Sequence, residues 1–188
     1  MSTVTPHRNL GSIVLWGGAA TLLCIPAIAM QFTNEVNWTA SDFLTVAVLL
    51  GTVGGAYEFL ARRSTGFAYR AGAGIALFTA LFLIWVNLAV GIIGSENNDA
   101  NMMYAGVLAT AVGGSMLARF RADGMMRAML ATAAAQVLVA AIAHAFQLGT
   151  DGDAWPRDVI GVTAIVTTMW LASAALFSRA RERLGRAA

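Results

Sequence analysis

The chain has 188 residues, of which 58% are apolar and 12% are charged, whereas soluble domains carry about 25% charged residues. All twelve basic residues are arginine, and the lack of lysine excludes Schiff-base chemistry and the P-loop lysine. One cysteine cannot form an internal disulfide, and two distant histidines, His7 and His144, cannot alone form a zinc or bis-histidine haem site. We therefore expect an integral membrane protein without a cofactor.

Six charge-poor segments separate the clusters of charged residues, and most are close to the roughly 20 residues that cross a hydrocarbon layer about 30 Å thick. The first of these is too long for a cleaved signal peptide, so we expect it to remain as a helix. We predict one all-α membrane domain over residues 1–188. Its six predicted transmembrane helices are 11–31, 42–61, 71–94, 102–119, 126–147 and 159–178.

The charges are distributed unequally between the two sides of this arrangement. If the helices alternate in direction, eleven of the twelve arginines lie on one side and seven of the ten acids lie on the other. Short cytoplasmic loops carry an excess of basic residues. Both termini are therefore predicted to be cytoplasmic, with the acidic loops outside.

Some features recur along the chain at nearly constant intervals. Asp42, Asp99 and Asp158, which are 57 and 59 residues apart, each open an even-numbered predicted helix, and Val53-Gly54-Gly55 recurs as Val112-Gly113-Gly114. Three tandem helical hairpins in the same orientation would explain this pattern. Six helices joined by short loops would give a similar spacing by chance, and this alternative stays open.

Polar side chains within the predicted helices are the candidates for function, because polar groups are costly in hydrocarbon. Glu58 is the acid within a predicted helix body, and it shares a helical face with Arg62. A proton or cation site is one interpretation of Glu58, and an ion pair with Arg62 at the headgroup level is the other. Four glycines are predicted to lie at contacts between helices, because small residues let helix backbones approach closely. They are Gly51, Gly55, Gly113 and Gly114.

Uncharged polar residues lie near the acidic outer side of the third, fourth and fifth predicted helices. Together with the outer acids, they predict an outward-facing polar pocket that binds a cation or a small cationic solute. The predicted ligand-binding residues are Asn87, Glu96, Asn97, Asn101, Tyr104, Gln136 and His144. For Asn87 and Gln136, hydrogen bonds between helices are the alternative.

Two segments carry a resemblance to known sequences. Met30-Gln31-Phe32-Thr33-Asn34-Glu35-Val36-Asn37-Trp38 and Trp85-Val86-Asn87-Leu88-Ala89-Val90-Gly91-Ile92-Ile93-Gly94-Ser95-Glu96 resemble segments of a group of small, uncharacterised bacterial inner-membrane proteins. The resemblance implies a bacterial inner-membrane location and carries no activity.

The expected function is transport or binding of a cation or small cationic solute in the inner membrane. The alternative is a non-catalytic structural or accessory subunit of a homo-oligomer or a larger membrane complex. We expect no enzyme, because no nucleophile and base pair or metal cluster is recognisable. The outer acids Asp151 and Asp153 lack the spacing of a calcium loop. The arginine-rich tail is explained by topology and lipid contact, so no nucleic acid partner is expected.

Overall fold

The computed structural model describes residues 9–64, 66–150, 152 and 154–185, and this part of the chain is all-helical with no strand. Five of its α-helices are long and apolar enough to cross a membrane, which indicates a membrane-embedded protein. The elements are α1 (Asn9–Ala29), α2 (Ala40–Ala61), α3 (Phe67–Ala89), the 3-10 helix η1 (Asp99–Met102), α4 (Met103–Leu117), α5 (Ala122–Ala145) and α6 (Arg157–Gly185).

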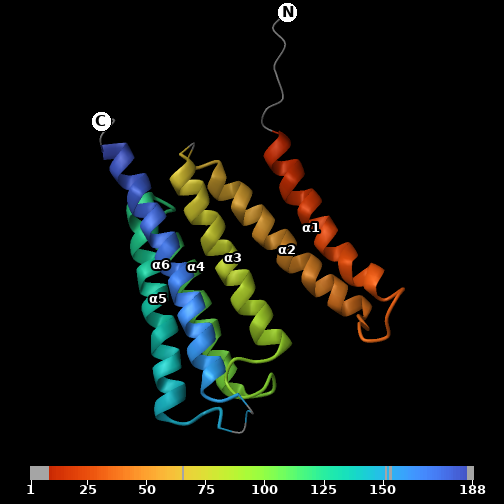
Figure 1. Cartoon of the computed structure of the whole chain (residues 1–188). Helices are drawn as coiled ribbons and strands as arrows, with labels where there is room; N and C mark the ends of the chain where they lie inside the picture. Colours follow the sequence, from red (N-terminus) through yellow and green to blue (C-terminus); the bar gives the residue numbers. More distant parts are fainter. Residues whose placement is uncertain (1–8, 65, 151, 153, 186–188) are drawn as a thin grey trace, which may run out of the picture. The chain divides into compact units, whose positions relative to one another are not determined.

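The chain divides into two compact units, and the single membrane domain expected from the sequence stays a prediction. Unit 1 covers residues 1–59 and unit 2 covers residues 60–188. Unit 1 contains α1 and most of α2, drawn in red and orange in Figure 1. Large apolar side chains are exposed around α1, for example Val14 at 68% and Leu22 at 54%. A helix that is apolar on all sides is typical of a membrane span.

Side chains of α1 and α2 are in contact within unit 1. The indole Nε1 of Trp16 donates a hydrogen bond of 3.1 Å to Oε1 of Glu58. A Cβ atom added at Gly54 would lie 3.0 Å from Cδ2 of Leu15, so glycine lets the two helices approach here. At the start of α2, the Thr39 amide donates to Oδ2 of Asp42 at 2.7 Å, which pairs a donor near the helix N-terminus with a carboxylate.

Unit 2 is a bundle in which α6 packs against α5 and α3, and α5 also packs against α4. Figure 1 shows the blue α6 between α5 and α3. The side chains that fill the core include Leu83, Met129, Trp170 and Phe177, each at most 1% exposed. Helices α5 and α6 therefore pack as a pair, whereas the main partner of α3 is α6. The predicted repeat of three hairpins stays a prediction.

Helices α3 and α6 approach each other closely at Gly72. A Cβ atom added there would lie 3.3 Å from the Ser173 carbonyl oxygen. The buried hydroxyl of Ser173 donates a hydrogen bond of 2.8 Å to the Gly72 carbonyl oxygen. Small residues that bring helix backbones together are a common packing device in membranes.

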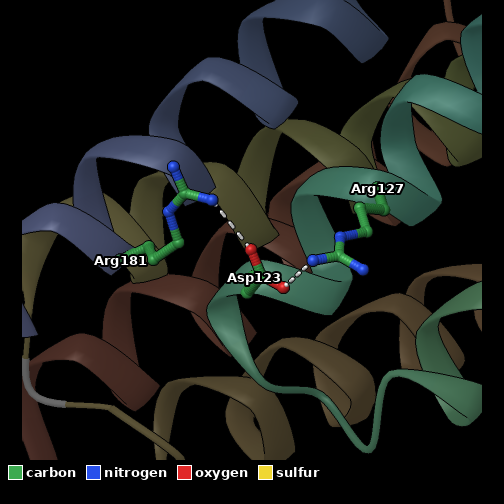
Figure 2. Close-up of polar contacts among 3 residues, drawn as sticks. All are labelled: Asp123, Arg127 and Arg181. Atoms are coloured by element: carbon green, nitrogen blue, oxygen red, sulfur yellow. Dashed lines mark hydrogen bonds and ion pairs between the residues drawn. The ribbon is translucent and has the colours of Figure 1, made fainter.

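The two ends of unit 2 carry opposite charge. At the arginine end, Asp123 at the start of α5 accepts a hydrogen bond from Arg181 of α6 at 2.9 Å, and Arg127 lies 2.7 Å from its other oxygen (Figure 2). The acidic end contains the loop from α3 to η1, which carries Glu96, and the start of α6. There Nδ2 of Asn98 donates to the Leu148 carbonyl oxygen at 2.7 Å, which joins the two loops of this end.

The observed helices differ from the predicted ones in two places that affect the site. The third helix ends at Ala89 rather than at residue 94, because the chain turns at Gly91 with φ of 69°. The fourth begins at Met103 and has 15 residues, so it is shorter than the other five. The expected fourth span, 102–119, is therefore not among the helices that are long enough to cross a membrane by themselves.

Candidate functional site

A pocket of about 300 Å³ opens between α3 and α4 at the acidic end of unit 2. Its floor is apolar, with side chains from the last turns of α3 and the first turns of α4. Its rim is polar and comes from the loop after α3 and from η1. The lining residues are Leu83, Ile84, Asn87, Leu88, Glu96, Asn97, Asn98, Asp99, Asn101, Met102, Tyr104, Ala105 and Leu108.

The shape of the rim depends on a tight loop between α3 and η1. Gly91 and Gly94 have φ of 69° and 74°, a region that glycine adopts without steric cost. A Cβ atom at Gly91 would lie 2.4 Å from the Ser95 carbonyl, so no other residue fits without movement. This turn directs Ile92 and Ile93, which are at most 1% exposed, back into the bundle.

Asn101 holds this loop in place with its side chain. Its Oδ1 accepts hydrogen bonds from the amides of Ile92 at 3.0 Å and Ile93 at 2.9 Å. Its Nδ2 donates to the carbonyl oxygens of Ile93 at 3.3 Å and Ser95 at 2.7 Å. These four bonds satisfy backbone groups that would otherwise be buried without partners. Asn101 lines the pocket, and its polar atoms are engaged by the loop.

The rim supplies oxygen acceptors and negative charge. Glu96 and Asp99 are exposed, and Nδ2 of Asn97 donates to Oε1 of Glu96 at 3.2 Å. Asn87 donates from Nδ2 to the Asn101 carbonyl oxygen at 3.2 Å, while its own Oδ1 is buried and accepts no hydrogen bond within the described chain. A buried acceptor without a donor is costly, so rotation of the Asn87 side chain toward the pocket would let Oδ1 pair with a donor on a ligand.

The structure brings together five of the seven residues predicted to bind a ligand. They are Asn87, Glu96, Asn97, Asn101 and Tyr104. Gln136 does not line the pocket and is fully buried in α5. His144 is exposed at the end of α5, and its ring stacks on Trp155 with 6.1 Å between the ring centroids. The binding role of all seven stays a prediction.

The sequence did not point to the apolar floor, and it did not single out Asn98 as a rim residue. Leu83 and Ile84 lie four and three residues before Asn87, so helical spacing alone would have placed them on the same face. Asn98 precedes η1 and accepts from the Ala100 amide at 2.9 Å through Oδ1. An Asn followed by Asp is typical of a helix start, and this signal would have placed Asn98 beside Asp99 on the rim.

The glycines predicted to pack helices differ in their surroundings. A Cβ atom at Gly114 would lie 2.9 Å from Cβ of Ala128, so α4 and α5 are in close contact there. At Gly51, Gly55 and Gly113, an added Cβ atom would meet nothing within 4 Å. The packing role of these three stays a prediction, and so does the ion pair of Glu58 with Arg62.

No group of three or more His, Cys, Asp or Glu side chains that could hold a metal ion occurs among the described residues. Asp151 and Asp153, which we compared with a calcium loop, lie outside the part that the structure describes. Comparisons with protein families, curated proteins and solved structures find no match to this chain. The inference of function therefore depends on the pocket itself.

Proposed function

We propose that this chain is a polytopic protein of the bacterial inner membrane that binds, and transports, a small organic cation through the pocket between α3 and α4. The observation that supports the proposal is the composition of this pocket. It combines two carboxylates and several amide groups at its rim with an apolar floor.

This combination fits an ammonium group that carries apolar substituents. The carboxylates of Glu96 and Asp99 would attract the charge, and Oδ1 of Asn87 would accept a hydrogen bond from an N–H group. The apolar floor at Leu83 and Leu108 would contact the substituents of the cation. A bare metal ion would make no use of this floor.

The proposal includes six membrane crossings with both termini in the cytoplasm. Helix α4 has 15 residues, which is about 22 Å at 1.5 Å per residue, and the four residues of η1 add about 8 Å. Their sum of about 30 Å matches the hydrocarbon thickness. The location of arginines at one end of unit 2 and acids at the other supports this topology through the positive-inside rule.

A binding assay on the purified protein in detergent tests the cation site. Titration with a series of alkylammonium ions and with Na⁺ should show the tightest binding for an alkylammonium ion. We expect Glu96→Gln to weaken this binding about tenfold, since a hydrogen bond to a charged group contributes about 1.5 to 3 kcal/mol.

Glu35→Gln is the matched control, because Glu35 is an exposed acid in unit 1 and does not line the pocket. Its affinity should equal that of the wild type. Equal affinities for Glu96→Gln and the wild type across the whole series would contradict the proposal. Flux of the bound ion into liposomes then separates transport from binding alone.

The second candidate is an accessory subunit that docks through unit 1. It is supported by the open surroundings of Gly51 and Gly55, which are one helical turn apart on α2. Gly55→Leu should then abolish a detergent-stable assembly seen by native mass spectrometry. A monomer for both wild type and variant would rule out homo-oligomer docking, and a partner that stays bound to the variant would rule out docking to a larger complex.

A further inference from the structure

Several buried polar side chains in unit 2 have no hydrogen-bond partner within the described chain. The atoms concerned include the Tyr104 hydroxyl, both polar atoms of the Gln136 amide, the hydroxyls of Thr163 and Thr167, and Nε1 of Trp170. Tyr104 and Gln136 are 0% exposed and Trp170 is 1% exposed. Buried polar groups are nearly always paired with protein or with water, so these groups require a partner.

The other fully buried hydroxyls that the structure describes in this bundle are paired. Thr79 donates to the Ile75 carbonyl oxygen at 2.7 Å, and Thr132 donates to the Ala128 carbonyl oxygen at 2.8 Å. A bond to the carbonyl four residues earlier is available to any threonine in a helix. Thr163 and Thr167 do not form this bond. The Thr167 hydroxyl is therefore available to another partner, whereas the Thr163 hydroxyl lies beside the Tyr104 hydroxyl.

These unpaired groups come from three helices at a similar depth in the bundle. Gln136 lies nine residues before the end of α5, and Thr167 lies ten residues after the start of α6, so both are about 14 Å from the acidic end. Tyr104 and Gln136 are also at a similar depth when they are measured from the arginine end. Tyr104 lies 13 residues before the end of α4, and Gln136 lies 14 residues after the start of α5. Since α5 packs against both α4 and α6, the three helices meet at this level.

The α6 members of this group share one helical face. Thr163, Thr167 and Trp170 are spaced four and three residues apart. The Thr163 hydroxyl is also the polar side chain that neighbours the Tyr104 hydroxyl. Tyr104 itself lines the pocket. Thr163 therefore places this face of α6 beside Tyr104, which is a residue of the pocket.

We propose that Tyr104, Gln136, Thr163 and Thr167 form an internal hydration site, which adjoins the cation pocket at Tyr104 and binds water near the middle of the membrane. Water fits because it donates and accepts hydrogen bonds, as this mixture of amide and hydroxyl groups requires. A buried water typically forms about three such bonds. The site contains no charged side chain, so an ion would be bound there only at a large desolvation cost. The proposal does not depend on cation binding.

Hydroxyl-radical labelling in H₂¹⁸O with detection by mass spectrometry tests this site on the full chain in detergent, without added cation. Tyr69 is the internal control, since it is 3% exposed and its hydroxyl donates to the Phe120 carbonyl oxygen at 2.6 Å. If water occupies the site, Tyr104 should incorporate ¹⁸O several-fold faster than Tyr69, although it is the more buried of the two.

Gln136→Leu should then reduce labelling of Tyr104 toward the level of Tyr69. Thr167→Val, which keeps the side-chain shape, should have the same effect and replaces Gln136→Leu if that variant fails to fold. Equal labelling of Tyr104 and Tyr69 in the wild type would overturn the proposal. So would fast labelling of Tyr104 that neither variant changes. A dry site makes a further opposite prediction, because Gln136→Leu would then remove unpaired buried groups and raise the melting temperature.

Discussion

Replacement of Asn101 by alanine should open the loop that forms the rim of the pocket. The substitution removes the acceptor of two buried amides, those of Ile92 and Ile93, which lie 3.0 and 2.9 Å from Asn101 Oδ1. A buried donor without a partner costs about 1 to 3 kcal/mol. Two of them should destabilise the closed loop by about 2 to 4 kcal/mol, since water that reaches the amides in part lowers the full cost. This corresponds to roughly 30-fold to 700-fold more frequent opening of the loop.

Hydrogen exchange with mass spectrometry measures this opening directly, because local opening determines the exchange rate of protected amides. We expect faster exchange in residues 90–98 and little change in α5 and α6. Asn97→Ala is the control, since the Asn97 side chain bonds only the exposed Glu96 and holds no backbone amide. Unchanged exchange in residues 90–98 of the Asn101→Ala protein, or an equal increase throughout the chain, would refute the reasoning.

Two further substitutions test helix packing and charge pairing in unit 2. Gly114→Ala would place a methyl group 2.9 Å from a methyl group of α5, and such overpacking costs about 1 to 3 kcal/mol. Gly113 has open space, so Gly113→Ala should gain from the higher helix propensity of alanine. The melting temperature of Gly114→Ala should therefore be lower than that of Gly113→Ala. Equal melting temperatures would contradict this packing. Arg181→Gln removes a hydrogen bond to Asp123 and should lower thermal stability slightly at low salt and not at high salt. Arg179→Gln provides the charge-matched control, and an effect that persists in high salt would show that Arg181 acts by packing.

The sequence by itself determined the helical and membrane-embedded character of the chain. Long apolar segments bounded by charges predict spanning helices because the backbone must satisfy its own hydrogen bonds in hydrocarbon. This argument located all five long helices, with ends displaced by up to seven residues. It also selected polar residues in and near α3 and α4, five of which line one pocket.

Hydropathy could not predict the end of α3. Residues 90–94 are as apolar as a helix in lipid, but Gly91 and Gly94 turn the chain and Asn101 pairs the freed amides. The apolar composition of residues 90–94 fits a continued helix and a turn equally well, because Ile92 and Ile93 are buried in either one. The turn is stabilised by Asn101, which lies eight residues after Ile93 and bonds its amide.

The surroundings of single side chains were likewise decided only by tertiary structure. Gln136 and Asn87 are both amides in the outer half of a helix, yet Asn87 lines the pocket and Gln136 is fully buried away from it. The sequence gives the helix and the depth of each residue through a fixed rise of about 1.5 Å. The neighbour of each helix face depends on which helices pack together, here α3 on α6 and α4 on α5. This arrangement depends in turn on close contacts between small residues, such as Gly72 with Ser173 and Gly114 with Ala128.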